Sequence, residues 1–396
     1  MSGTTKSEAE RPIRVSHVIT TLVAGGTERM LQRIVAETGR GGVQHQVISL
    51  TAGGEVADEL RASGVSVASL DMRRTGTVPD LHAIWRLATY LRDGAPHVVQ
   101  AWMYHANLLA SFGSLLAGTG RAVWGIRAAS LPTGHERTRT IMLARLSAAL
   151  AGTLARGVVV NGDRARQTHI AAGYPAARMV TIPNGYDLAV WHSDAQARAH
   201  VRHELGLGPD ACIIGMIANF RPIKDHRTFF RAIGELRRTH SNIHVLLAGV
   251  DTGLDVPAFR RLVEQELGTA AGVSALGSRR DVPRLTSALD LAVLSSIDES
   301  FPNVVAEAMA CGVPVVTTDA GDVRTILGGD DDIVPIGDYR ALAGRLRWWL
   351  DQSCDSRREH GAQLRARVAR LYSLDAVSRQ YASYWRSLAG DSSSDR

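Results

Sequence analysis

The stretch from Leu291 to Thr317 reads L-A-V-L-S-S-I-D-E-S-F-P-N-V-V-A-E-A-M-A-C-G-V-P-V-V-T. Its two ends, Leu291–Leu294 and Val313–Thr317, are short apolar runs typical of buried strands, and Asn303–Cys311 between them has a helical pattern. A strand, a helix and a second strand in this order form the unit from which parallel sheets are built. The stretch therefore predicts an α/β fold.

The same alternation of strands and helices runs through the chain in two series. The first series of predicted strands is Ile13–Ile19, His45–Leu50, Val65–Leu70, His97–Trp102, Ala122–Arg127, Gly157–Asn161 and Met179–Ile182. The second is Ile213–Ala218, His244–Ala248, Val273–Leu276, Leu291–Leu294, Val313–Thr317 and Asp332–Pro335. Each series predicts a doubly wound parallel sheet, and the pattern lapses between them at Asp187–Gly208. We expect one domain over residues 1–187, a second over 188–372, and a C-terminal helix and loose tail over 373–396.

Composition and charge narrow the class of protein. A chain of 396 residues can bury two cores, and its net charge of +6 comes from scattered arginines, without the basic blocks typical of nucleic-acid binding. The three cysteines, Cys212, Cys311 and Cys354, are too few and too widely spaced for a disulfide framework or a zinc site. No leader-like or membrane-spanning apolar run occurs. We expect a cytoplasmic protein that does not bind nucleic acid.

The start of the helix after Leu294 has the features of an anion site. Pro302 suits a helix start, and the amides of residues 303–305 would be first-turn donors at the positive end of the helix dipole. Glu299 and Glu307 flank these donors; carboxylates would repel a phosphate but can accept hydrogen bonds from pairs of hydroxyls. Phosphate with two sets of diols describes a sugar nucleotide. The alternative is an ordinary amphipathic helix with solvated glutamates.

A cationic loop follows the first strand of the second series. The segment from residue 217 to 228 reads I-A-N-F-R-P-I-K-D-H-R-T, and it carries Arg221 and Lys224 beyond the carboxyl end of a strand, where doubly wound domains bind ligands. Two cations there could hold a diphosphate and stabilise it as a leaving group. A solvated pair of basic residues is the alternative.

Two loops of the first series are further candidates. The segment V-A-G-G-T-E-R-M places Gly25 and Gly26 before a helix, where the backbone can approach a ligand closely, although it lacks the third glycine of a dinucleotide fingerprint. In W-M-Y-H-A-N-L-L, His105 lies between a strand and a helix and could hydrogen-bond a sugar hydroxyl. A plain tight turn and a packed histidine are the alternatives.

The acidic run Asp330–Asp332 is the nearest approach to a metal motif, but its place between glycines and a short strand favours a solvated loop. With basic residues and a helix start available to bind phosphate, no metal and no other cofactor are expected.

Together these segments resemble the family-four retaining glycosyltransferases of the GT-B fold. The resemblance runs from Ile13 to about Trp385 and includes I-P-N-G-Y-D and A-C-G-V-P-V-V-T-T-D, in the same order and spacing as in the family. It implies two Rossmann-like doubly wound domains that face each other across a cleft. The first would bind acceptor and the second a nucleotide sugar, and the last helix would cross back to the first domain.

The resemblance also implies roles for individual residues. His105 and Glu299 match catalytic positions near the donor sugar; the implied donor-binding residues are Gly25, Gly26, Arg221, Lys224, Arg279, Asn303, Val304 and Glu307. In these roles Arg221 and Lys224 bind the diphosphate, Glu307 holds the ribose hydroxyls, and Arg279 lies near the base. Ser300, where glycine is frequent, and the acidic loop at 328–332 depart from the family pattern and leave the acceptor open.

The expected function is a retaining, metal-independent hexosyltransferase that uses a nucleotide sugar, with UDP as the expected nucleotide. We expect its acceptor to be a glycan, a lipid-linked intermediate or a small molecule, in polysaccharide, lipopolysaccharide or other glycoconjugate biosynthesis. A nucleotide-sugar epimerase and a catalytically silent nucleotide-sugar-binding protein are the alternatives. Residues 137–156 fit a core-facing helix best, and otherwise a peripheral contact with the inner face of a membrane.

Overall fold

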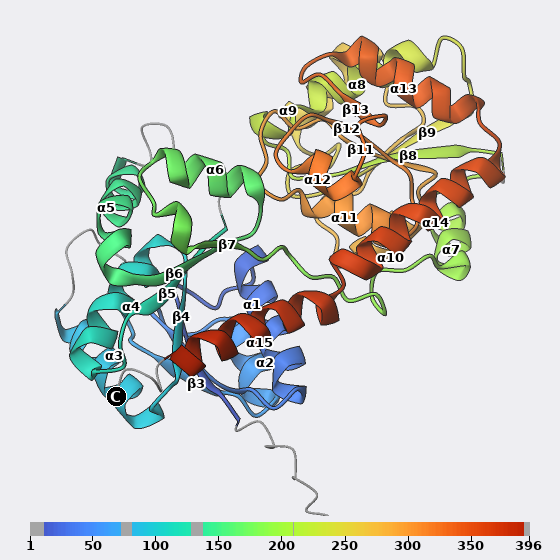
Figure 1. The fold of residues 1–396 in the computed structure, drawn as a ribbon. Helices are drawn as coiled ribbons and strands as arrows, with labels where there is room; N and C mark the ends of the chain where they lie inside the picture. The colour runs from blue at the N-terminus through green and yellow to red at the C-terminus, as the bar shows by residue number, and fades with distance from the viewer. Residues whose placement is uncertain (1–11, 73–80, 128–137, 209, 392–396) are drawn as a thin grey trace, which may run out of the picture. The chain divides into compact units, whose positions relative to one another are not determined.

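The computed structural model describes residues 12–72, 81–127, 138–208 and 210–391. The chain divides into two compact units: unit 1 is Met1–Gly185 with Val377–Arg396, and unit 2 is Tyr186–Ala376. Figure 1 shows both units with their helices and strands labelled. Each unit has its own sheet and its own cores, so each is described by itself.

Unit 1 is built on a seven-stranded sheet with the order β3-β2-β1-β4-β5-β6-β7, in which every pairing is parallel. The strands are β1 (Arg14–Ile19), β2 (Gln44–Ser49), β3 (Ser66–Ser69), β4 (Val98–Trp102), β5 (Ala122–Ile126), β6 (Ala155–Val160) and β7 (Met179–Thr181). Strand order reverses direction between β1 and β4, which is the topological switch point of a doubly wound sheet.

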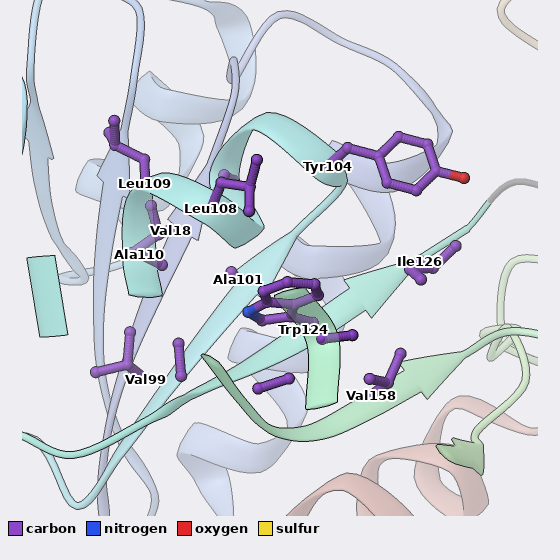
Figure 2. Close-up of a cluster of buried hydrophobic side chains, with 14 of the residues drawn as sticks. Val18, Val99, Ala101, Tyr104, Leu108, Leu109, Ala110, Trp124, Ile126 and Val158 are labelled. Carbon is purple, nitrogen blue, oxygen red and sulfur yellow. The ribbon is translucent and has the colours of Figure 1, made fainter. Parts of the chain in front are cut away.

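Helices cover both faces of this sheet. One core joins the sheet to α1 (Gly26–Arg40), α2 (Glu55–Ala62) and the C-terminal α15 (Leu374–Asp391). The other joins it to α3 (Leu81–Gly94), α4 (Tyr104–Ala117), α5 (Thr138–Leu154) and α6 (Asp163–Ala171). Figure 2 shows part of this second core, where Leu108 and Leu109 of α4 lie above Trp124 and Val158 of the strands.

The C-terminal helix completes unit 1. Val377, Tyr381 and Trp385 of α15 are at most 1% exposed and pack into the core with α1 and α2. Beside Trp385 lies a histidine pair, in which Nε2 of the buried His17 is 3.0 Å from Nδ1 of the half-buried His45. Burial lowers the pKa of His45 to about 4 and holds the pKa of His17 well below its usual range, with a further lowering by His45. Both rings are therefore neutral at pH 7.

Unit 2 is built on a six-stranded parallel sheet with the order β10-β9-β8-β11-β12-β13. The strands are β8 (Cys212–Ile217), β9 (Ile243–Ala248), β10 (Val273–Ala275), β11 (Leu291–Leu294), β12 (Val315–Thr318) and β13 (Ile333–Val334). Its switch point lies between β8 and β11.

Two cores also cover this second sheet. One contains residues of α8 (His226–Leu236), α9 (Pro257–Leu267) and α13 (Tyr339–Asp351). The other contains residues of α7 (Ala195–Glu204), α10 (Val282–Ser287), α11 (Asn303–Ala310), α12 (Val323–Leu327) and α14 (Cys354–Leu371). Within the described ranges, no helix of either unit is long and apolar enough to cross a membrane.

The predicted α/β class with two Rossmann-like doubly wound domains is confirmed, and the thirteen predicted strands coincide with β1–β13 to within two residues at each end. The segment between the two sheets differs from the prediction. The segment 187–208, expected to be irregular, contains α7, whose buried residues are few: Ala197, Val201 and Arg202.

The acidic run at 330–332 also differs from expectation, because Asp332 is buried rather than solvated. Its Oδ1 accepts hydrogen bonds from Arg345 Nε at 2.7 Å and Trp349 Nε1 at 2.6 Å, and its Oδ2 lies 3.2 Å from His360 Nε2. Burial by itself would raise the pKa of Asp332, but the hydrogen bonds from His360, Trp349 and Arg345 outweigh burial and lower it. Asp332 thus joins α13 and α14 to the end of the sheet.

Candidate active site

The candidate residues gather at the carboxyl ends of the switch-point strands in each unit. In unit 1, Gly25 and Gly26 follow β1, and His105 follows the adjacent β4. In unit 2, Lys224 follows β8, and Glu299 follows the adjacent β11. Ligands of open α/β sheets bind at such points because two loops diverge there and leave a crevice.

The loop after β8 is a tight turn that presents Lys224. Pro222–Lys224 forms a 3₁₀ turn, and Asp225 then adopts a left-handed conformation with φ 44° while its side chain accepts from Thr228 N. A left-handed non-glycine residue costs of the order of 1 kcal/mol or more, and such strain collects at functional sites. Ile297 N donates to Ile223 O at 2.8 Å, which ties this turn to the loop after β11.

Glu299 is the centre of a small polar cluster. Its Oε1 accepts hydrogen bonds from Lys224 Nζ and, at 2.7 Å, from Ser296 Oγ. The carboxylate side chain is 14% exposed and the lysine side chain 24%, so the ion pair is partly shielded from water. Both groups contact Oε1 rather than Oε2. The cluster therefore fixes one oxygen of Glu299 and leaves the second available to a ligand.

The loop after β12 packs closely against the backbone at Glu299 and Ser300. Gly321 has φ 67°, and a Cβ at this position would lie 2.6 Å from the carbonyl oxygens of both Glu299 and Ser300. Asp322 N donates to Ser300 O at 3.0 Å. Only glycine gives both this conformation and this approach, so Gly321 sets the path of the backbone at Glu299.

The start of α11 matches the predicted anion site in part. The helix begins at Asn303, with Pro302 as its extended N-cap at ψ 95°. The amide of Val305 is not free, because it donates to Pro302 O at 3.1 Å. Asn303 is exposed, and its Oδ1 accepts from Tyr186 OH at 2.7 Å. First-turn amides, the positive helix end and an anchored amide side chain remain as the binding features.

Val304 and Glu307 lie one turn apart on α11 and are both half-buried. They line the same small cavity, which lies between α11 and strands β8, β11 and β12 and is otherwise apolar except for Thr286. Glu307 is close enough to Cys311 to raise the pKa of that thiol, although burial raises it more.

Two predicted donor-binding residues lie apart from the Lys224–Glu299 cluster. Arg221 is exposed and lines an open hollow formed with α8 and α9. Arg279 follows β10, two strands from β8, and its guanidinium is engaged by Asp281 at 2.7 and 2.8 Å and by Glu204 at 2.9 Å. Hydrogen bonds from Arg279 to Asp281 and then to Glu204 raise the pKa of Arg279.

In unit 1, the Gly25–Gly26 turn lies beside the carboxylate of Glu28. A Cβ on Gly25 would lie 2.5 Å from Glu28 Oε2, whereas a Cβ on Gly26 would meet nothing within 4 Å. Burial raises the pKa of Glu28, and a hydrogen bond from its own backbone opposes this rise. The turn is thus open at Gly26 and carries an acceptor group beside it.

His105 lies in the first turn of α4, after a strained corner. Met103 has φ 72° and precedes the helix as its N-cap, and Asn107 braces the corner by bonding both backbone groups of Gly125 on β5. The His105 ring is half-buried, and burial lowers its pKa. A neutral imidazole near pH 7 is suited to hydrogen bonding with a hydroxyl group.

Sequence reasoning missed three residues that position the site. Ser296 holds Glu299, Tyr186 holds Asn303, and Gly321 allows the close backbone approach. All three lie in or beside segments quoted above: Tyr186 in I-P-N-G-Y-D, Ser296 in the stretch Leu291–Thr317, and Gly321 two residues after A-C-G-V-P-V-V-T-T-D. Their contacts with Asn303 and Glu299 had no signal in the sequence. Among the described residues, no three His, Cys, Asp or Glu side chains gather closely enough to hold a metal ion.

Comparisons with known proteins agree with this architecture. The family described as "Glycosyl transferases group 1" matches residues 211–352, and the "Glycosyl transferase 4-like domain" matches residues 25–185. The crystal structure of Anabaena Alr3699/HepE in complex with UDP aligns with a TM-score of 0.80 at 20% identity, covering 95% of this chain and 100% of that one. Two Rossmann-like units in one chain define the GT-B class of glycosyltransferase folds.

The chain belongs to the group 1 glycosyltransferases. D-inositol 3-phosphate glycosyltransferase from Mycobacterium marinum is 32% identical over 170 residues, which are 42% of this chain and 35% of that protein's length. The putative glycosyltransferase EpsF of Bacillus subtilis is 24% identical over 320 residues, which are 78% of this chain and 79% of that protein.

Proposed function

We propose that this protein transfers a hexosyl unit from a UDP-sugar to an acceptor hydroxyl, with retention of anomeric configuration and without a metal ion. The observation that carries the proposal is the Lys224–Glu299–Ser296 cluster beside the start of α11. The cation and the helix N-terminus there suit the diphosphate of a sugar nucleotide, and the carboxylate suits the hydroxyls of its sugar. The UDP bound in the Anabaena structure supports UDP as the nucleotide.

The diphosphate would lie against Lys224 and the first turn of α11. Amides at a helix start and a lysine ammonium give charge-assisted hydrogen bonds to phosphate oxygens, and these bonds strengthen as the leaving group gains charge. Arg221, on the same loop, would add charge by reorienting its exposed side chain. Glu307 would accept hydrogen bonds from the ribose hydroxyls, and Arg279 would lie near the base.

Glu299 would accept hydrogen bonds from hydroxyls of the donor sugar through the oxygen that Lys224 and Ser296 leave available. In the absence of ligand the ion pair with Lys224 holds this carboxylate in place. His105, Gly25 and Gly26 are the corresponding groups of unit 1: the neutral imidazole would hydrogen-bond the sugar, and the open glycine turn would allow a close approach to the donor.

In the transfer step, the bond between the sugar C1 and the β-phosphate oxygen breaks, and the electron pair leaves with UDP. The acceptor oxygen forms its bond to C1 on the same face, and its proton passes to the departing phosphate oxygen. Lys224 and the α11 amides would stabilise the negative charge on that phosphate, so no metal is required for charge balance. Glycan, lipid-linked and small-molecule hydroxyls all fit this step as acceptors.

Purified protein should be assayed for UDP release from UDP-glucose, UDP-galactose and UDP-N-acetylglucosamine, with GDP- and TDP-sugars as controls. We expect slow hydrolysis of one UDP-sugar without acceptor, faster release with pooled acceptors, and no change on adding EDTA. His105→Ala should lower turnover by about 100-fold with little effect on the Kd for UDP. A new sugar nucleotide formed from donor alone would indicate an epimerase instead, and an inverted anomeric signal by NMR would contradict retention.

A further inference from the structure

We infer that the outer faces of α3, α4 and α5 in unit 1 form a docking surface for an anionic lipid bilayer. These three helices pack in sequence on one face of the unit 1 sheet. The surface lies on the helices rather than at the strand ends, so lipid binding can be measured separately from sugar transfer.

The central helix of this surface, α4, is apolar on both sides. Leu108 and Leu109 face the sheet core (Figure 2). On the opposite side Phe112, Leu115 and Leu116 are 36%, 52% and 49% exposed, and every other residue of α4 is buried or half-buried. A helix on the surface of a protein in water normally turns polar residues outward. The exposed apolar residues of α4 therefore indicate that, besides the sheet core, this helix contacts an apolar partner on its outer side.

The neighbouring helices continue the same character. Met142 and Leu146, one turn apart on α5, are 61% and 47% exposed, and Leu81 and Trp85 on α3 are 77% and 58% exposed. Seven of the fifteen large hydrophobic side chains exposed in the described residues therefore lie on these three consecutive helices. We call these exposed apolar side chains of α3, α4 and α5 the outer apolar face.

Close packing keeps α3 and α4 together beneath this face. Gly113 of α4 lies against Leu87 of α3, so closely that a Cβ on Gly113 would be 2.7 Å from Leu87 Cδ2. Arg92 of α3 donates from Nη2 to Leu116 O at 2.6 Å. The two helices therefore present one surface, with a guanidinium at its border.

Charge decides which partner fits the outer apolar face. The sequences of the three helices contain a single acidic residue, Asp93 at the end of α3, whereas Arg92, Arg121 and Arg145 are exposed on or beside them. In a two-fold contact between two copies, the same arginines would face one another with little acid to pair them. A bilayer with anionic lipids offers hydrocarbon to the apolar side chains and negative headgroups to the arginines.

The topology brings the α3 and α5 part of this face toward the candidate site of unit 1, whereas Leu115 and Leu116 lie at the far end of α4. Helices α3 and α5 follow β3 and β5, so Leu81, Trp85 and Met142 lie in the helix turns closest to the carboxyl edge of the sheet, where His105 is found. If the proposed transfer holds, an acceptor anchored in the bilayer would be presented at that edge.

The test is co-sedimentation of the full chain with vesicles of phosphatidylcholine, alone or with about one third phosphatidylglycerol. We expect binding to the anionic vesicles, weakened by roughly tenfold for each inserted side chain removed in Leu115→Ser and Met142→Ser. Arg145→Gln should weaken it about fivefold on anionic vesicles only. The matched control is Val250→Ser with Ile336→Ser, which removes side chains of 49% and 44% exposure from unit 2 and should leave binding unchanged.

The inference is overturned if the wild-type protein does not bind anionic vesicles, or if the α4 and α5 variants bind as tightly as the control. It is also overturned if light scattering shows a dimer that these variants dissociate, because the face would then belong to a second copy. UDP titration of the same proteins separates the two proposals: failure to bind UDP counts against the transferase, and failure to bind lipid counts against the docking surface.

Discussion

Replacing Lys224 by methionine is the sharpest test of the proposed donor site. Its ammonium bonds Glu299, and the lysine side chain is three-quarters buried, so a diphosphate bound there would be partly shielded from water. A hydrogen bond to a charged group contributes about 1.5–3 kcal/mol. Taking about 2 kcal/mol for a partly exposed lysine, Lys224→Met should weaken UDP binding about thirtyfold.

The partner substitution distinguishes the two roles within the ion pair. In the free protein Glu299 competes with a phosphate for Lys224, so Glu299→Gln should leave the Kd for UDP unchanged or lower it. Turnover should nevertheless fall by about 100-fold or more, because the proposed acceptor for the sugar hydroxyls is weakened. Isothermal titration with UDP and an assay of UDP release measure these two effects separately.

The control is Arg231→Met, which removes a cation that is 52% exposed and paired with Glu266 on α9. It should change the UDP affinity by less than about twofold, since surface ion pairs contribute little. A Lys224→Met protein that binds UDP as tightly as this control would refute the diphosphate assignment. Equal losses of UDP affinity in Lys224→Met and Glu299→Gln would show that Glu299 acts only by holding Lys224.

Three further perturbations test the supporting structure. Gly321→Ala forces a Cβ against two carbonyl oxygens and should lower the free energy of unfolding by about 1–3 kcal/mol in urea titrations. The control is Gly337→Ala, because Gly337 has a similar φ of 76° but open space around it. The difference between the two losses of stability measures the effect of the carbonyl contacts. Asp332→Asn should lower the free energy of unfolding by about 3 kcal/mol, because it breaks the buried ion pair with Arg345. The pKa of Asp332 is lowered in the folded state, so the wild-type protein should lose this stability as pH falls below the pKa of the unfolded state. The stability of the variant should not show this pH dependence. For His45 the folded pKa is about 4 against 6.5, so the unfolded chain binds more protons between these values. Stability should then fall with decreasing pH there, by about 1.4 kcal/mol per pH unit per histidine, and His45→Gln should flatten thermal-melt profiles in that window.

Much of the fold could be predicted from the chain because parallel strands are buried on both faces and read as apolar runs. Every predicted strand was found, and the strand ends placed Lys224 and Glu299 on adjacent loops. The helix α14 was not predicted, since only Gly361, Leu364 and Val368 of its eighteen residues are buried. A helix with so few apolar positions has almost no periodic signal.

The details of the candidate site were less accessible, because they depend on contacts between distant segments. Tyr186 and Asn303 are 117 residues apart, and no local pattern links them. The helix start at residue 303 was predicted, but the Val305 amide is taken up by Pro302 O through a 3₁₀-type bond that spacing does not reveal. The buried state of Asp332 likewise depends on Arg345, Trp349 and His360 from two later helices.

The discontinuity of unit 1 has a consequence for the order in which the chain folds. Trp385 is fully buried against α1 and α2, yet it is synthesised about 200 residues after β7, behind every residue of unit 2. Unit 2 is contiguous and can fold as soon as Ala376 emerges, whereas the earlier part of unit 1 must wait with an apolar surface uncovered. A released chain that ends at Ala376 should therefore display a protected second unit and a protease-sensitive first one.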